Sequence, residues 1–185
     1  LAHLLPGRNL VMLDRSGSMG TNIRLGDKVS RTSCIDKASL ICATIAKATN
    51  ANIVSFGSSA KYTSYNPNQD VFSLGKSLAK PNMGGTSLSS AWDLIKRSGK
   101  QYDRVFILSD NECNRGSSYS SYMSYVQAAG SPYVYSIDLA GYGTNCIAGD
   151  KVRYYYGYGF SMFEDIASSE FNPNYHIEKV KQIII

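Results

Sequence analysis

Short apolar runs that end in a polar residue recur along this chain and alternate with segments of helical periodicity. The runs Asn9 to Asp14 and Arg104 to Asp110 have apolar centres, which is typical of strands buried on both faces of a sheet. Between them, residues 32–49 repeat apolar side chains at the three- and four-residue spacing of a helix. This alternation predicts a three-layer, doubly wound α/β fold, with a mostly parallel sheet and helices on both of its faces.

The same patterns predict the remaining elements. We expect further strands over residues 51–56, 133–139 and 152–156, and a hairpin at 57–65 that continues into another strand. We expect further helices over 70–78, from Ser87 or Ser89 to Gly99, over 119–129 and over 163–167. The Ser- and Gly-rich segment after Asp14 is expected to be a loop. Residues 140–151 are expected to be the most flexible segment, and residues 176–185 receive no assignment.

Length and composition restrict the class of protein. A chain of 185 residues with 43% hydrophobic residues predicts a single globular domain over 1–185. The chain begins at Leu1 without a methionine, so we expect a piece of a longer protein whose other domains are partners. No apolar run has the length needed to span a bilayer, so no membrane partner is expected. The net charge of +5 weakly favours acidic partners.

The cysteines and histidines do not form a metal-binding pattern. The four cysteines, which include no Cys-x-x-Cys pair, are Cys34, Cys42, Cys113 and Cys146. The two histidines lie near opposite ends of the chain, so a zinc site is not expected. Cys34 and Cys42 share a helical pattern and are expected to face a core. We expect reduced thiols and a cytoplasmic location.

Two strand ends and two loops bring oxygen donors together. In open α/β sheets, ligands bind beyond the carboxyl ends of the strands, where Asp14 and Asp110 lie. The pattern Asp14-x-Ser16-x-Ser18 in an extended loop turns alternate side chains toward one point. Thr86 adds a hydroxyl from a glycine-rich loop before a helix. Such hard donors suit Mg²⁺ best, with Mn²⁺ or Ca²⁺ as alternatives.

A site of this composition would leave its cation receptive to an outside ligand. Two carboxylates and three hydroxyls carry only two formal negative charges, so the ion keeps its Lewis acidity. It can then accept a carboxylate or phosphate oxygen from a partner. Taken singly, Asp14, Ser16 and Ser18 also fit a turn and helix-cap cluster, because these residue types are common there for hydrogen-bonding reasons.

The set Asp14, Ser16, Ser18, Thr86 and Asp110 resembles the metal-ion-dependent adhesion site of von Willebrand factor type A domains. The donors occur in the family's order, and the resemblance covers about residues 9–170. It implies that fold, those five residues as metal ligands, and a role in binding rather than catalysis.

A narrower resemblance is to the C-terminal domain of Ro autoantigen (TROVE) proteins. It rests on Asp14 to Met19, on Phe106 to Glu112 followed by Gly116, and on Gly157 to Phe160 before a short amphipathic helix. Ser109 stands where that family has threonine. In the family, this domain closes a helical-repeat ring that binds small RNAs, so the resemblance implies a ribonucleoprotein. No ring sequence is present in this chain.

Enzymatic alternatives lack their required residues. An aspartate at the end of a first strand is also the nucleophile of haloacid-dehalogenase-type phosphatases, but they need an aspartate where this chain has Ser16. Neither Ser16 nor Ser18 lies in a Gly-x-Ser-x-Gly elbow. The segment Gly57 to Lys61 lacks the Gly-Lys-Ser/Thr ending of a phosphate-binding loop, and no dinucleotide-binding Gly-x-Gly-x-x-Gly pattern follows the first strand. We therefore do not expect an enzyme.

Polar residues near the cation are expected to contact the partner, which is either an acidic protein ligand or a small non-coding RNA. They are Arg15, Arg24, Arg31, Asn111, Glu112 and Arg115. Tyrosines could stack on bases, but for Tyr122 and Tyr125 packing against the sheet is favoured. Two hypotheses follow: a cation-dependent binding module, or a mainly structural domain that closes a ring and has a secondary cation site.

Overall fold

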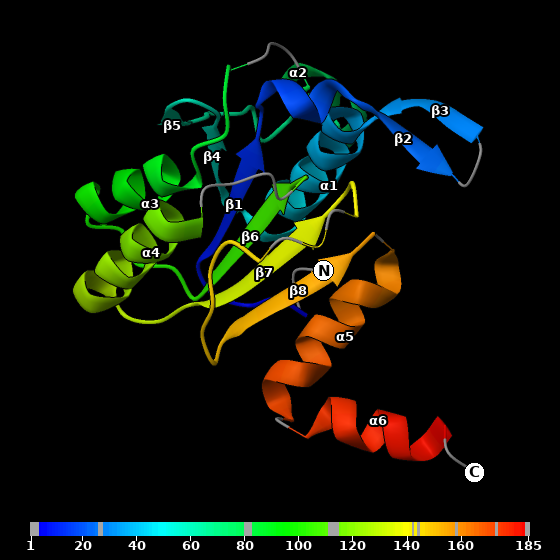
Figure 1. Ribbon diagram of the computed structural model, residues 1–185, viewed down its shortest axis with the longest axis vertical. Helices are drawn as coiled ribbons and strands as arrows, with labels where there is room; N and C mark the ends of the chain where they lie inside the picture. Colours follow the sequence, from blue (N-terminus) through cyan, green and yellow to red (C-terminus); the bar gives the residue numbers. More distant parts are fainter. Residues whose placement is uncertain are drawn as a thin grey trace.

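The computed structural model describes residues 4–25, 28–79, 83–110, 115–141, 143, 145–157, 159–172 and 174–183. Its centre is a six-stranded sheet in the order β5-β4-β1-β6-β7-β8 (Figure 1). The strands are β1 (Asn9–Asp14), β4 (Asn52–Phe56), β5 (Ala60–Tyr62), β6 (Arg104–Ser109), β7 (Tyr133–Asp138) and β8 (Val152–Tyr156). All neighbouring pairs are parallel except β4 with β5, which is antiparallel. The predicted α/β class and mostly parallel sheet are confirmed.

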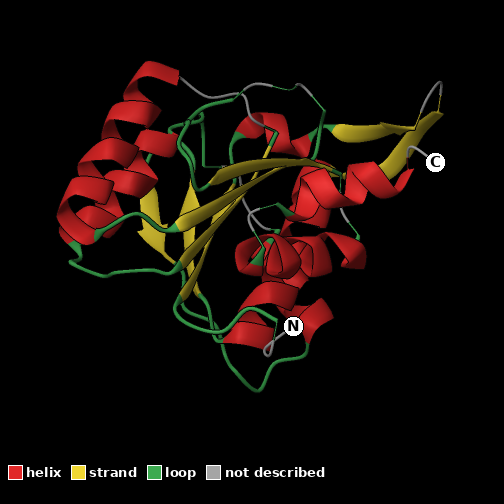
Figure 2. Cartoon of the chain, turned by 90° about the horizontal axis from the view of Figure 1, so that it is seen from below, coloured by secondary structure: helices red, strands yellow, loops and turns green. Residues whose placement is uncertain are grey.

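Helices cover both faces of the sheet (Figures 1 and 2). One face packs against α1 (Cys34–Thr49), α2 (Val71–Leu78) and α5 (Phe160–Phe171). The other packs against α3 (Leu88–Arg97) and α4 (Arg115–Ala129). A last helix, α6 (Tyr175–Ile183), follows α5 and lies away from the sheet (Figure 1).

The two cores divide the side chains of each strand. On β1, Val11 and Leu13 join the core beneath α1, whereas Leu10 and Met12 join the core beneath α3 and α4. Successive side chains of a strand point to opposite faces, so a strand covered on both sides must be apolar at every position. Tyr122 and Tyr125 are 2% and 0% exposed in the second core, as the sequence predicted.

The segment after β1 differs from the expected loop. Residues 17–20 form a single 3₁₀ turn, η1 (Gly17–Gly20). The antiparallel hairpin of β2 (Asn22–Leu25) and β3 (Lys28–Ser33) follows and makes a second, two-stranded sheet. Ser33 then caps α1, because its hydroxyl accepts a hydrogen bond from the backbone of Asp36 while the Asp36 carboxylate accepts one from the backbone of Ser33.

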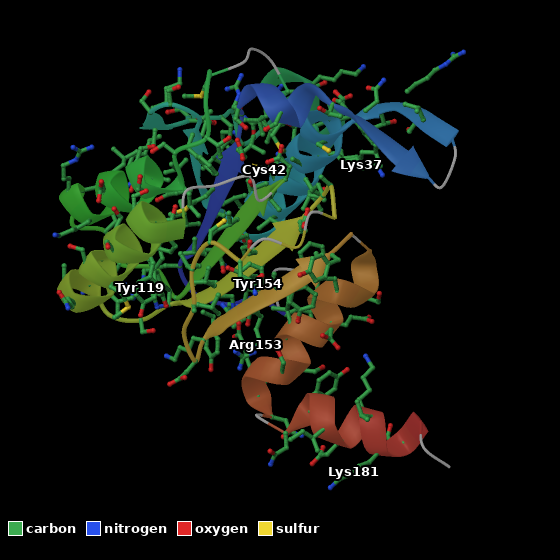
Figure 3. The ribbon with its side chains drawn as sticks, viewed as in Figure 1. Lys37, Cys42, Tyr119, Arg153, Tyr154 and Lys181 are labelled. Carbon is green, nitrogen blue, oxygen red and sulfur yellow. The ribbon has the colours of Figure 1, made fainter. Side chains whose placement is uncertain are left out.

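Several boundaries near the chain's end also differ. Helix α4 begins at Arg115 rather than Tyr119, and α5 covers Phe160–Phe171 rather than only residues 163–167. The unassigned end of the chain forms α6. The described part of the loop after β7 is held in place by Tyr154 on β8 (Figure 3), whose hydroxyl donates to the Ile147 carbonyl at 2.7 Å.

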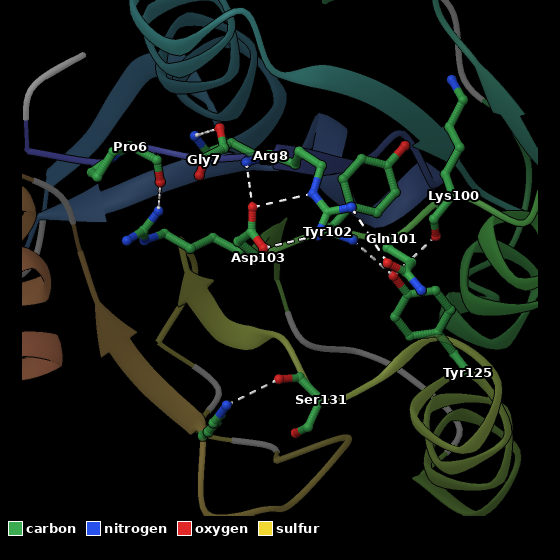
Figure 4. A network of polar contacts seen from close by, with 12 residues as sticks. Pro6, Gly7, Arg8, Lys100, Gln101, Tyr102, Asp103, Tyr125 and Ser131 are labelled. Carbon is green, nitrogen blue, oxygen red and sulfur yellow. Dashed lines mark hydrogen bonds and ion pairs between the residues drawn. The ribbon is translucent and has the colours of Figure 1, made fainter.

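Polar contacts link the segments that precede strands β1 and β6. The Arg8 guanidinium pairs with the Asp103 carboxylate at 3.1 Å, and the Tyr125 hydroxyl donates to the Lys100 carbonyl (Figure 4). Deeper in the protein, Arg104 on β6 forms an ion pair with Glu170 on α5, and their side chains are only 8% and 7% exposed. The Tyr135 hydroxyl donates to the same carboxylate at 2.6 Å. This buried triad ties α5 to the sheet.

The cysteines depart from the expectation of four reduced thiols. Cys34 and Cys42 are free and buried, as predicted, but Cys146 is disulfide-bonded. Cys113 lies outside the described residues. A stable disulfide is typical of an oxidising compartment, and the cytoplasmic location stays a prediction. No helix in the described parts of the chain combines the length and hydropathy needed to cross a membrane.

The thiol count can be checked directly. We expect alkylation of the unreduced, denatured protein to modify Cys34 and Cys42 but not Cys146, and alkylation after reduction to modify Cys146 as well. Peptide mass spectrometry identifies the modified residues. Modification of Cys146 before reduction would contradict its disulfide.

Candidate metal centre

The first carboxylate of the site is enclosed at the end of β1. Asp14 is 0% exposed, and its two oxygens accept hydrogen bonds from the Ser16 amide at 2.8 Å and the Ser109 hydroxyl at 2.6 Å. Burial raises the pKa of Asp14 to about 6, and the negative charge of Asp110 adds to this rise while the hydrogen bonds oppose it. No ion pair found among the described residues includes Asp14. The folded chain therefore holds a charge that a cation would stabilise.

The two serine hydroxyls of the motif converge beside this carboxylate. The Ser16 and Ser18 Oγ atoms lie 3.1 Å apart and share a hydrogen bond. Ser16 is 4% exposed, and Ser18 is half-buried. The sequence analysis attributed this convergence to an extended loop. In the structure, Ser18 instead lies on the 3₁₀ turn η1.

The threonine loop is held against the Asp14 loop through its backbone. The Met83 amide donates to the Arg15 carbonyl, and the Gly17 amide donates to the Gly84 carbonyl, both at 2.8 Å. Thr86 follows on this loop, is half-buried and precedes Ser87, the N-cap of α3. The structure therefore places the loop that carries Thr86 beside the loop that carries Ser16 and Ser18.

The loop after β4 supports the threonine loop from its other side. The Ser58 amide donates to the Met83 carbonyl at 2.9 Å, and the Ser87 amide donates to the Gly57 carbonyl at 2.8 Å. A Cβ atom added at Gly57 would lie 2.5 Å from the Met83 carbonyl oxygen, too close for any side chain. Gly84 has a φ of 83°, a conformation that favours glycine. These glycines allow the close stacking of the three loops.

The second carboxylate lies on the neighbouring strand. Asp110 follows the last residue of β6, which pairs directly with β1, and is 1% exposed. Its contribution to the pKa of Asp14 shows that the two charges interact. The expected partner-contacting residues Asn111 and Glu112 lie outside the described residues.

The donor set fits a hard divalent cation. Its groups are carboxylates and hydroxyls, and no group of three or more His, Cys, Asp or Glu side chains suited to a metal occurs in the parts of the chain that the structure describes. Mg²⁺, Mn²⁺ and Ca²⁺ take oxygen ligands, whereas softer metals take imidazole and thiolate. Asp14, Ser16, Ser18, Thr86 and Asp110 would hold such an ion, which would supply a Lewis-acidic position for an acidic oxygen.

The structure describes only some of the arginines that were expected to surround the cation site. Arg15 is 8% exposed and its Nε atom is buried without a hydrogen-bond partner among the described residues, so little of this side chain is available to a ligand. Arg31 is exposed on β3. Arg24 lies on β2 and Arg115 begins α4, but their side chains are outside the described set. A role for these arginines stays a prediction.

Sequence reasoning did not single out two residues at this edge. Ser109 directs the Asp14 carboxylate through its 2.6 Å hydrogen bond, and the signal for it was its position before a strand-terminal aspartate. Asp138 ends β7 and is 1% exposed. Its carboxylate accepts hydrogen bonds from the Ala140, Gly141 and Gly143 amides at 2.8–2.9 Å. An apolar strand that ends in aspartate was the available signal, as for Asp14 and Asp110.

This arrangement of strands, helices and loops is the fold of a von Willebrand factor A-like domain. No protein-family model and no curated protein matches the sequence. Among solved structures, the Ro (Rsr) protein of Deinococcus radiodurans is similar, with a TM-score of 0.70, 17% identity and 88% of this chain covered. The chain spans about a third of that protein, since the match covers 34% of it.

Two further solved structures share the fold. The conserved hypothetical protein BatB from Bacteroides thetaiotaomicron matches with a TM-score of 0.58 and 16% identity, over 87% of this chain and 95% of that one. The PilB minor pilin from Streptococcus sanguinis matches with a TM-score of 0.53 and 12% identity, over 87% of this chain and 60% of that one. At these identities the similarity concerns the fold.

Proposed function

We propose that the chain is a divalent-cation-dependent binding module that engages an acidic ligand at the Asp14–Asp110 edge of the sheet. The observation that carries the proposal is the Asp14 carboxylate, which is fully buried beside a second carboxylate and two convergent serine hydroxyls. Mg²⁺ is the cation we favour, because the donors are hard oxygens. The charge of the donor set leaves the ion able to accept one carboxylate or phosphate oxygen from a partner.

Binding rather than catalysis is the second part of the proposal. A phosphatase with an aspartate nucleophile at the position of Asp14 needs an aspartate two residues later as its general acid. This chain has Ser16 there, which cannot act as a general acid. The Ser16 amide and the Ser109 hydroxyl each donate to one Asp14 oxygen, which fixes the orientation of the carboxylate and supports a role as a ligand.

The test is a calorimetric titration of metal-free protein with Mg²⁺, compared with the Thr86→Val variant. Valine keeps the shape of threonine but lacks its hydroxyl, so we expect at least about tenfold weaker cation binding, the cost of one lost ligand. N-acetylglutamate amide should then bind only in the presence of Mg²⁺. Unchanged cation affinity in the variant, or probe binding that survives EDTA, would refute the proposed site.

A second candidate role is structural, as one domain of a longer Ro-like chain. The TM-score of 0.70 to the Ro protein and the coverage of only a third of it favour this role. A Ro-like chain would contain helical repeats and would bind small RNA, and RNA affinity that falls steeply with salt in the longer chain would support it. Absence of RNA binding at low salt would exclude it.

A further inference from the structure

A cavity of about 360 Å³ opens beside the candidate cation site. Its walls come from the 3₁₀ turn and hairpin after β1, from the start of α1, and from the ends of β6, β7 and β8. Its lining includes Ser18, Ile23, Cys34, Asp110, Asp138 and Leu139. Two of them, Ser18 and Asp110, are also candidate cation ligands. When an oxygen of a ligand binds the cation, the neighbouring group of that ligand would therefore enter this cavity.

Backbone hydrogen bonds fix the walls of the cavity relative to the site. The Thr21 amide donates to the Ser18 carbonyl at 2.9 Å, and the Cys34 amide donates to the Thr21 carbonyl at 3.0 Å. On the opposite side, the Leu139 amide donates to the Ser109 carbonyl at 3.1 Å. The cavity is thus built from the same segments that carry the cation ligands and does not depend on a separate element.

One wall of the cavity is apolar, whereas Thr21, Asn22 and Asp138 are polar members of its lining. Cys34 and Leu139 are 2% and 7% exposed, and Ile23 is half-buried and packs against the same core. These side chains offer no strong hydrogen-bonding group. An aliphatic side chain fits this wall, because a polar group placed against it would leave hydrogen-bonding atoms unpaired.

The charges around the cavity exclude a second acidic group. Asp110 and Asp138 both line it, and none of the described lining residues is basic. The Asp138 carboxylate already accepts hydrogen bonds from three backbone amides, so a hydrogen-bond donor on a ligand would gain little from it. A second phosphate, next to the one on the cation, would meet the Asp138 carboxylate, which no described basic side chain of the lining neutralises, whereas a neutral group meets no such repulsion.

We propose that this cavity is a specificity subsite that accepts an uncharged aliphatic side chain adjacent to the acidic residue of a protein ligand. The proposal rests on the proposed function, because the acidic residue must first reach the cation. It selects a peptide over RNA as the ligand, since successive phosphates would place negative charge against Asp138.

The experiment compares capped peptides bound to Mg²⁺-loaded protein. N-acetyl-Glu-Leu-amide should bind at least about tenfold more tightly than N-acetylglutamate amide, because one aliphatic side chain is removed from water. N-acetyl-Glu-Glu-amide should gain nothing over the single glutamate. NMR spectra of ¹⁵N-labelled protein should show the leucine peptide, and not the single glutamate, shifting the Ile23 and Leu139 amides.

A variant that fills the cavity separates this proposal from the proposed function. Ala140 is exposed at the cavity wall and is not a candidate cation ligand, so Ala140→Phe should leave Mg²⁺ affinity and binding of N-acetylglutamate amide unchanged. It should remove the advantage of the leucine peptide. The matched control is Ala128→Phe, on the exposed side of α4, which should behave as the parent protein.

Each outcome points to one conclusion. If the leucine peptide binds no better than the single glutamate, or if Ala140→Phe leaves its advantage intact, the subsite is wrong while the cation site stands. If poly-uridine RNA binds in a Mg²⁺-dependent manner and competes with the leucine peptide, the selection of a peptide ligand is wrong. If no probe binding depends on Mg²⁺, the proposed function itself fails.

Discussion

Asp14→Asn is expected to abolish Mg²⁺ binding and, at the same time, to stabilise the cation-free protein. The side chain is 0% exposed, and its pKa of about 6 shows that the folded state resists its negative charge. Asparagine has the same shape and can still accept the Ser16 amide. Because the pKa lies about two units above its ordinary value, removing the charge should add up to about 3 kcal/mol to the free energy of unfolding at pH 7.

Urea denaturation in EDTA and in Mg²⁺ measures both effects. The parent protein should gain stability when Mg²⁺ is added, since a ligand that binds only the folded state shifts the equilibrium toward it. Asp14→Asn should show no such gain. Calorimetric titration with Mg²⁺ gives the loss of binding independently. A variant that still binds Mg²⁺ with the parent affinity would rule out Asp14 as a ligand.

Asp138→Asn is the matched control, because Asp138 is equally buried at the end of a neighbouring parallel strand. Its carboxylate accepts three backbone amides, and an amide side chain cannot accept all three. The variant should therefore lose about 1–3 kcal/mol of stability. Its Mg²⁺ affinity should stay close to that of the parent. Opposite signs of the two stability changes would distinguish a cation ligand from a carboxylate that organises a loop.

The elements buried on both faces could be predicted from sequence. Strands β1, β6 and β7 are apolar at nearly every position because helices cover them on both sides, and a short apolar run between polar residues is typical of such strands. Once β1 and β6 are predicted, the positions of Asp14 and Asp110 follow, because neighbouring parallel strands end at a common edge of the sheet. These two aspartates could therefore be placed at one edge of the sheet from the sequence alone, and the action of the five donors as ligands is a proposal.

The elements that are exposed or held by tertiary contacts could not be predicted. On the β2–β3 hairpin, Val29 is 61% exposed and Ile23 is only partly buried, so hydrophobic alternation gives little signal. Helix α4 was predicted only from residue 119, because its first residues include glycine and serine, which have weak helical preference. The stacking of the Gly57 and Met83 loops depends on segments far apart in the chain, and no local pattern encodes it.

Glu170→Ala is expected to cause the largest loss of stability. The side chains of Arg104 and Glu170 are 8% and 7% exposed. The variant would therefore leave a buried guanidinium without its carboxylate partner. Burial and the hydrogen bond to Glu170 raise the pKa of Tyr135, whose protonated hydroxyl would also lose its acceptor. Breaking a buried pair on one side costs about 3–5 kcal/mol, which corresponds to a fall in Tm of about 10 °C.

The control for Glu170→Ala is Lys179→Ala, which removes an ion pair to Asp165 whose lysine is 55% exposed. The lysine of that pair is largely in solvent, so its loss should cost much less stability than the loss of the buried pair. Calorimetric melting of both variants tests the difference, and equal effects would contradict the buried triad. Arg104 begins β6, whereas Asp110 follows its other end, so Mg²⁺ affinity measured well below Tm should be unchanged in Glu170→Ala. The triad therefore secures α5 on the sheet without tuning the site.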